Sequence, residues 1–166
     1  MEVCLPVGMR SCQNVHEDTG AVSKWQRVHD CGIEFAQLHD RNLDPAMSKA
    51  AQADAFSKIS DLMAKARAGL IDFTSRNPEA KDIELPGYQY LLELRPKRGA
   101  ATAFGKPVRV VRLYYMEPQW LSDILLALHL ATKPDGPDPD QEQNASIRVA
   151  GNRADEWSRY SRQLTG

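Results

Sequence analysis

Basic side chains are concentrated in one segment of this 166-residue chain. Residues 86–116 hold six lysines and arginines against one acidic residue, Glu93, which gives a local net charge of +5, although the whole chain carries −1. The flanking segments are both acidic, with ten basic against thirteen acidic residues in 1–85 and five against eight in 117–166. A local charge of this size attracts a polyanion that the overall charge does not suggest. The six are Arg95, Lys97, Arg98, Lys106, Arg109 and Arg112.

RNA is one such polyanion, and its cleavage is a chemistry that arginine and lysine side chains can support without a catalytic triad. RNA breaks when a 2′-hydroxyl attacks the adjacent phosphate, so a protein accelerates the step by aligning the strand, removing the hydroxyl proton and neutralising the phosphorane. Alternation along a strand places Arg95 on the face opposite Leu92 and Leu94, and therefore away from an apolar core. Arg109 and Arg112 lie three residues apart and face opposite sides of a regular strand, so only one of them can join Arg95. Alternation does not decide which.

His129 is the candidate for proton transfer. In a regular strand it lies opposite Leu128 and Leu130, on a face of small residues with room for a ligand. The ordinary pKa of an imidazole, about 6.5, suits a proton shuttle. A half-buried strand histidine that bonds to a neighbour explains the same pattern.

Further residues of the segment are suited to hold RNA. Lys97, Arg98 and Lys106 fall in a glycine-containing loop, where lysines and arginines contact phosphates, and we expect Arg109 just after the loop to bind RNA as well. Tyr114 and Tyr115 point to opposite faces of their strand, so we expect one to pack in the core and the other to stack on a base or offer its hydroxyl.

Several other function classes lack their signatures. The chain contains no nucleophile elbow, phosphate-binding glycine loop, HExxH or CxxC motif, and the spacing of Cys12, His16, His29 and Cys31 matches no common zinc site. We therefore expect no metal or cofactor. Three cysteines are an odd number, which favours reduced thiols in the cytoplasm over a disulfide framework. The longest uncharged apolar run falls far short of the roughly 20 residues of a membrane helix.

The helices and strands that position these residues are predicted from hydrophobic periodicity and from the positions of glycine and proline. Asp44 and Pro45 predict the start of a helix over 45–68, because apolar residues recur there at three- and four-residue steps, with Phe56, Ile59, Leu62 and Met63 on one stripe. Residues 1–24 show no period and predict a poorly ordered arm, and 25–166 predict a single domain. A short strand near Trp25 and a short helix follow the arm. We expect three antiparallel strands at 88–95, 108–116 and 124–131, a loop at 133–140 and a terminal helix that Gly151 interrupts. The fold class is α+β.

The strand sequences resemble a known toxin family. Leu92 to Arg95 reads LELR, a basic loop follows, 110–115 reads VVRLYY, and a third apolar strand passes His129 before Lys133. Upstream, 85–88 reads LPGY. These motifs and their order over 25–160 resemble the RelE/ParE superfamily of toxins, especially its HigB-like branch.

The resemblance implies both a fold and an activity. It implies a RelE-like antiparallel sheet of three or four strands with helices packed on one face. It also implies a cytoplasmic, metal-independent mRNA endoribonuclease that inhibits translation, on or off the ribosome, and that a cognate antitoxin protein neutralises. The catalytic residues that it implies are Arg95, Arg112, His129 and Lys133.

Two other functions remain open. A ParE-like protein shares this fold but acts by binding DNA gyrase. A catalytically silent module from a phage or mobile element binds a protein partner. The acidic loop 134–140, which holds three aspartates and three prolines, favours these alternatives because carboxylates beside Lys133 repel an RNA phosphate.

Overall fold

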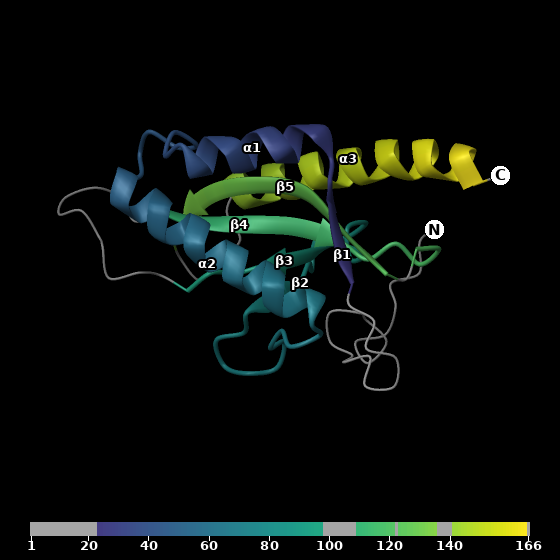
Figure 1. Ribbon diagram of the computed structural model, residues 1–166, viewed down its shortest axis with the longest axis horizontal. Helices are drawn as coiled ribbons and strands as arrows, with labels where there is room; N and C mark the ends of the chain where they lie inside the picture. Colours follow the sequence, from purple (N-terminus) through teal and green to yellow (C-terminus); the bar gives the residue numbers. More distant parts are fainter. Residues whose placement is uncertain (1–22, 98–108, 122, 136–140, 166) are drawn as a thin grey trace.

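A five-stranded mixed sheet separates two layers of helices (Figure 1). The computed structural model describes residues 23–97, 109–121, 123–135 and 141–165. The strand order is β1-β5-β4-β3-β2, with β1 parallel to β5 and the other neighbours antiparallel. The strands are β1 (Lys24–Arg27), β2 (Ala80–Asp82), β3 (Leu92–Leu94), β4 (Arg109–Met116) and β5 (Ile124–Pro134). The helices are α1 (His29–His39), α2 (Lys49–Arg67) and α3 (Gln141–Thr165).

The central strand, β4, is buried on both faces. Val111, Leu113 and Tyr115 of β4 point into the cluster under α1 and α2, whereas Tyr114 and Met116 point into the cluster under α3. Alternation therefore sends each apolar residue of β4 after Val110 into one core or the other, which is why the strand reads as an apolar run around Arg112.

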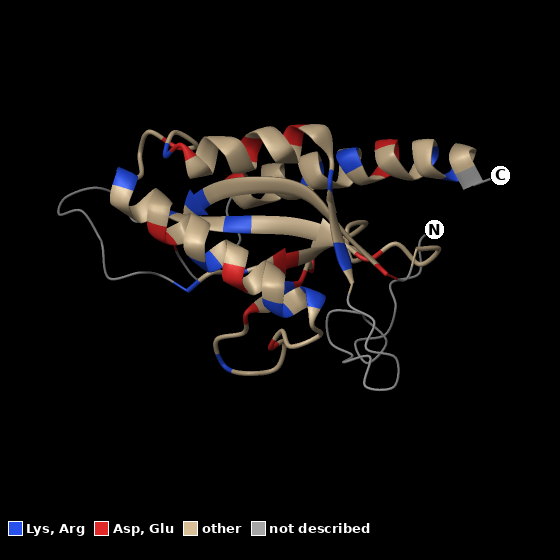
Figure 2. Cartoon of the chain, viewed as in Figure 1, with Lys and Arg blue, Asp and Glu red and all other residues tan. Residues whose placement is uncertain are grey.

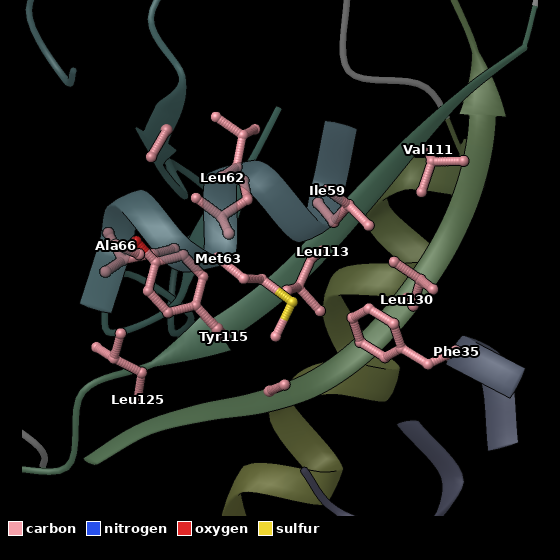
Figure 3. Close-up of a cluster of buried hydrophobic side chains, with 14 of the residues drawn as sticks. Phe35, Ile59, Leu62, Met63, Ala66, Val111, Leu113, Tyr115, Leu125 and Leu130 are labelled. Atoms are coloured by element: carbon pink, nitrogen blue, oxygen red, sulfur yellow. The ribbon is translucent and has the colours of Figure 1, made fainter. Parts of the chain in front are cut away.

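Helix α2 covers one face of the sheet and packs Ile59, Leu62 and Met63 against β4 and β5 (Figure 3). Phe56, expected on the same stripe, is partly buried at its edge. The helix begins after Ser48, whose hydroxyl accepts a hydrogen bond from the Ala51 N–H at 3.1 Å. The predicted start at Pro45 was early by one turn, because the Asp44 carboxylate bonds the Ala46 N–H in a separate turn.

Helix α3 covers the opposite face and continues past the end of the sheet (Figure 1). Ile147, Ala150 and Ala154 form its buried stripe. The predicted interruption at Gly151 does not occur. The missing side chain lets Tyr88 lie against the helix, because a Cβ at Gly151 would fall 2.4 Å from Tyr88 Cε1. The glycine here serves close packing instead of ending the helix.

The α+β class is confirmed, and the details differ in three ways. The sheet has five strands because the short strand predicted near Trp25 joins it as β1, parallel to β5, and β2, which was not predicted, joins the opposite edge. Helices cover both faces instead of one. The strand predicted at 88–95 is short, since 88–91 form a turn in which the Leu91 N–H donates to the Tyr88 carbonyl.

A β-bulge changes which residues of β5 share a face. Tyr114 pairs with His129 but Tyr115 pairs with Ala127, so Leu128 is an extra residue. Past the bulge the alternation is reversed, and Leu130 joins the α1 and α2 side. His129 therefore lies on the α3 side, stacked on Tyr114, and the regular alternation expected from the sequence was wrong here.

Candidate functional site

A basic groove opens beside the end of β3. Its cavity of about 380 Å³ is lined by four cationic side chains and, among the described residues, one carboxylate, that of Asp135. The cations are Arg76, Arg95, Lys97 and Arg112. Three of these were expected from the sequence. Arg76 was not, because it precedes the basic segment and reaches the groove through the loop between α2 and β2.

Arg112 lies at the base of this groove as half of a buried ion pair. Its Nε lies 2.7 Å from Glu93 Oε1, and the two side chains are 7% and 4% exposed. One terminal nitrogen also donates to the Val111 carbonyl at 2.9 Å. Burial lowers the pKa of the Arg112 guanidinium, and the charge of Glu93 opposes that shift. The arginine is thus fixed in position, with its charge largely balanced from within the protein.

Arg95 is more accessible than Arg112. Its side chain is 33% exposed, and its Nε lies 3.8 Å from the same Glu93 oxygen. The other oxygen of Glu93 accepts a hydrogen bond from Gln143 Nε2 of α3 at 3.0 Å. Glu93 therefore holds two arginines of neighbouring strands side by side and ties them to α3.

Lys133 lies near this cluster. It is buried at the end of β5 and lines a second cavity, of about 280 Å³, together with Glu93 and Arg95. Figure 2 shows basic positions in the middle of β4 and at the end of β5, where Arg112 and Lys133 lie. Arg95 and Arg112 thus lie against Glu93, and Lys133 lines the same cavity as Glu93 and Arg95. These are three of the four residues that the resemblance implies for catalysis.

His129, the fourth, lies in a separate network at the edge of β5. Its Nδ1 is 2.8 Å from Glu34 Oε1 of α1, and an Arg153 nitrogen of α3 lies 2.8 Å from the same oxygen. The Leu130 N–H donates to the other Glu34 oxygen, and Arg153 donates to the Leu128 carbonyl. These bonds satisfy the edge of β5 where β1 has ended, so the network has a structural use.

This network also shifts the ionisation of Glu34. Burial on its own would raise the pKa of that carboxyl, but hydrogen bonds from His129, Leu130 and Arg153 hold the pKa below its usual value. His129 is only 15% exposed on its side chain and does not line the basic groove. Of the two interpretations of His129, a half-buried strand histidine that bonds to a neighbour fits the structure better than a proton shuttle.

Arg109 is held by acidic partners at the other end of β4. Its Nε lies 2.7 Å from Asp44 Oδ2, and a terminal nitrogen lies 2.5 Å from Glu142 Oε2 of α3. Hydrogen bonding to Glu142 and the charge of Asp44 raise the pKa of Arg109, and burial opposes them. The same Asp44 oxygen also pairs with the Thr132 hydroxyl. Arg109 therefore links α3 to the turn before α2 and is not presented for RNA.

The remaining candidates fall into two groups. Tyr114 and Tyr115 are both buried, in the α3 and α2 cores respectively, so neither offers its ring to a base as expected for one of them. Lys97 is exposed in the groove, while Arg98 and Lys106 lie outside the described residues.

Metal ligands do not cluster within the described parts of the chain. Cys31 is a buried free thiol there, and burial raises its pKa to about 12. Cys4, Cys12 and His16 lie outside the described residues.

Comparisons with protein-family models, with curated proteins and with solved structures found no match to this chain. None of the helices over the described residues is both long and apolar enough to span a bilayer.

Proposed function

We propose that this protein binds RNA through the basic groove and acts as a RelE/ParE-like toxin that cleaves mRNA and is neutralised by a cognate antitoxin. The observation that carries the proposal is the groove itself, where four cations surround a space of about 380 Å³ with a single carboxylate among the described lining residues. Cations held close together in a hollow bind the phosphates of a nucleic acid strand. Such a toxin works in the cytoplasm.

The arrangement of the arginines suits the chemistry of this cleavage. A 2′-hydroxyl loses its proton and attacks the adjacent phosphorus, the bond to the 5′ oxygen breaks, and that oxygen takes up a proton. The phosphate carries extra negative charge in the transition state, which charge-assisted hydrogen bonds stabilise. Arg95 is exposed enough to make them, and Glu93 fixes its orientation beside Arg112. In this scheme Arg95 is the catalytic residue and Arg112 supports it.

Binding without cleavage is the second candidate, and the position of His129 favours it. The imidazole is engaged by Glu34 and does not line the groove, so the groove lacks the proton acceptor that the sequence suggested. In this case the protein binds and masks RNA.

Incubation of the purified protein with mRNA, with and without ribosomes, separates the two functions. Cleavage supports the toxin, and tight salt-dependent binding without cleavage supports the second candidate. For a cleaving protein we expect Arg95→Ala to lower the rate by about 10²–10³, with little change in the melting temperature. Lys97→Ala should mainly weaken RNA binding.

Arg148→Ala is the matched control, because Arg148 is an exposed arginine of α3 outside the groove. Absence of RNA binding by the parent protein would refute both functions. A supercoiling assay would then test gyrase as the target. Folded Arg95→Ala protein that arrests growth as strongly as the parent would remove Arg95 from the site.

A further inference from the structure

A second pocket adjoins the basic groove. It measures about 280 Å³ and lies between residues 81–86 and the first turns of α3. Arg95 lines both hollows, so the two adjoin at this side chain. A nucleotide whose phosphate occupies the groove therefore has its base within reach of the pocket.

The lining of this pocket combines apolar and polar side chains. Ile83, Leu85, Pro86 and Ile147 supply the apolar side, which suits the faces of a planar ring. Glu93 and Lys133, which are 3% and 5% exposed, supply buried charges of opposite sign. The rest of the lining is also polar or charged and consists of Lys81, Asp82, Glu84, Arg95, Gln143 and Asn144.

Glu93 keeps acceptor capacity in spite of its partners. One of its oxygens pairs with Arg112 and the other accepts from Gln143. A carboxylate has about four lone-pair sites, so about two remain. An ammonium such as that of Lys133 has three donor hydrogens. The pocket thus offers a carboxylate acceptor and a cationic donor in the same small space.

We propose that this pocket binds a guanine base of the RNA, an inference that rests on the proposed RNA-binding function. The Watson–Crick edge of guanine places two adjacent donors, N1–H and the N2 amine, next to the O6 acceptor. This edge complements Glu93 beside Lys133. Adenine and cytosine turn a ring-nitrogen lone pair toward a carboxylate in the same position, and uracil offers one N–H. The pocket therefore discriminates in favour of guanine.

The test uses the full chain and short single-stranded RNAs at one fixed salt concentration. A uridine-rich oligonucleotide with one central guanine is compared by fluorescence anisotropy with the same strand carrying adenine or inosine. We expect the guanine strand to bind about 10-fold more tightly than the adenine strand. Inosine, which lacks the N2 amine, should fall between them. These comparisons use the parent protein and do not depend on the folding of a variant.

A variant with a larger side chain in the pocket tests whether the preference for guanine arises there. Leu85→Trp should abolish the difference between guanine and adenine strands while leaving the affinity for oligouridine nearly unchanged. Val149→Trp is the control, because Val149 is an exposed residue of α3 that does not line the pocket.

The outcomes distinguish this inference from the proposed function. Equal binding of all strands, weakened by Arg95→Ala but not by Leu85→Trp, overturns the guanine pocket and leaves the RNA-binding groove. A preference for adenine, or a guanine preference that survives Leu85→Trp, also overturns it. Absence of binding by any RNA refutes the proposed function itself.

Discussion

Removing the charge of Glu93 tests whether the arginines of the site are positioned as the structure indicates. Glu93 is the counter-ion of Arg112 at 2.7 Å and lies 3.8 Å from Arg95. The substitution Glu93→Gln preserves the size of the side chain and a hydrogen-bonding partner for Gln143. It removes the carboxylate that lies against two neighbouring guanidinium groups, one of them 7% exposed.

The expected cost follows from this burial. Breaking a buried ion pair by removing one partner destabilises a protein by about 3–5 kcal/mol, because the other charge stays buried and uncompensated. Arg112→Met should cost less, about 1–3 kcal/mol, because Glu93 then still faces Arg95 and accepts from Gln143. We therefore expect unequal effects from the two halves of one ion pair.

Urea unfolding of the parent, both single variants and the double variant measures this asymmetry. The double variant should be more stable than Glu93→Gln, because it removes the stranded charge of Arg112, so the double-mutant cycle gives a clear coupling energy. In thermal melts, Glu93→Gln should lower the midpoint by about 10 °C for a chain of this length.

Two results would refute the reasoning. One is a loss below about 1 kcal/mol for Glu93→Gln, the range of exposed ion pairs. The other is additivity of the two substitutions, since groups in direct contact are expected to be coupled.

Three further substitutions or labelling experiments test other parts of the fold. Gly151→Ala should lower the free energy of unfolding by about 1–3 kcal/mol, because the added Cβ would clash with Tyr88. Asn152→Ala, at the exposed neighbouring position, is the control and should leave urea unfolding unchanged. Equal effects of the two substitutions would contradict this packing. Glu34 has a lowered pKa, so its contribution to stability is present above its ordinary value of 4.5 and is lost as the pH falls through the lower, folded value. Glu34→Gln should therefore flatten the acid side of a plot of urea midpoint against pH, and an unchanged slope would count against the network. The thiol of Cys31 is buried and has a pKa of about 12, so it should resist maleimide in the folded protein and react once urea unfolds the chain. Peptide mass spectrometry locates the label. Equal rates of labelling in the folded and unfolded protein would exclude burial of the thiol.

Elements with strong local signals were predictable from the sequence. The apolar period of α2, the β-branched and aromatic run of β4 and the apolar run of β5 all became the expected elements. Alternation predicted that Arg95 lies on the face opposite Leu92 and Leu94. Both leucines lie in the core under α2, as this prediction requires. Period and propensity act over a few residues, and this is the range in which they succeed.

Features that depend on distant partners were not predictable in the same way. The bulge at Leu128 moved His129 to the other face of β5, and no residue in that stretch marks a bulge. Glu34 and His129 are 95 residues apart in the sequence, and His129 and Arg153 are 24 apart. Their network therefore forms only when α1 and α3 pack beside β5. The sequence did not predict Arg76 as a groove residue, because the loop that carries it reaches the groove only in the folded chain.

The charge of the basic segment is also reduced by folding. Arg109 is neutralised by Asp44 and Glu142, and Arg112 is paired with Glu93, so these two contribute little to the field outside the protein. A buried, paired charge makes few of the contacts that release counterions from RNA. Within the described residues, the groove therefore depends on Arg95 and Lys97 together with Arg76, which comes from outside the segment. The segment with the +5 excess supplies three of the four cations that line the groove, and its charge serves two purposes. One part holds the strands and helices together, and only the accessible part is available to bind a phosphate.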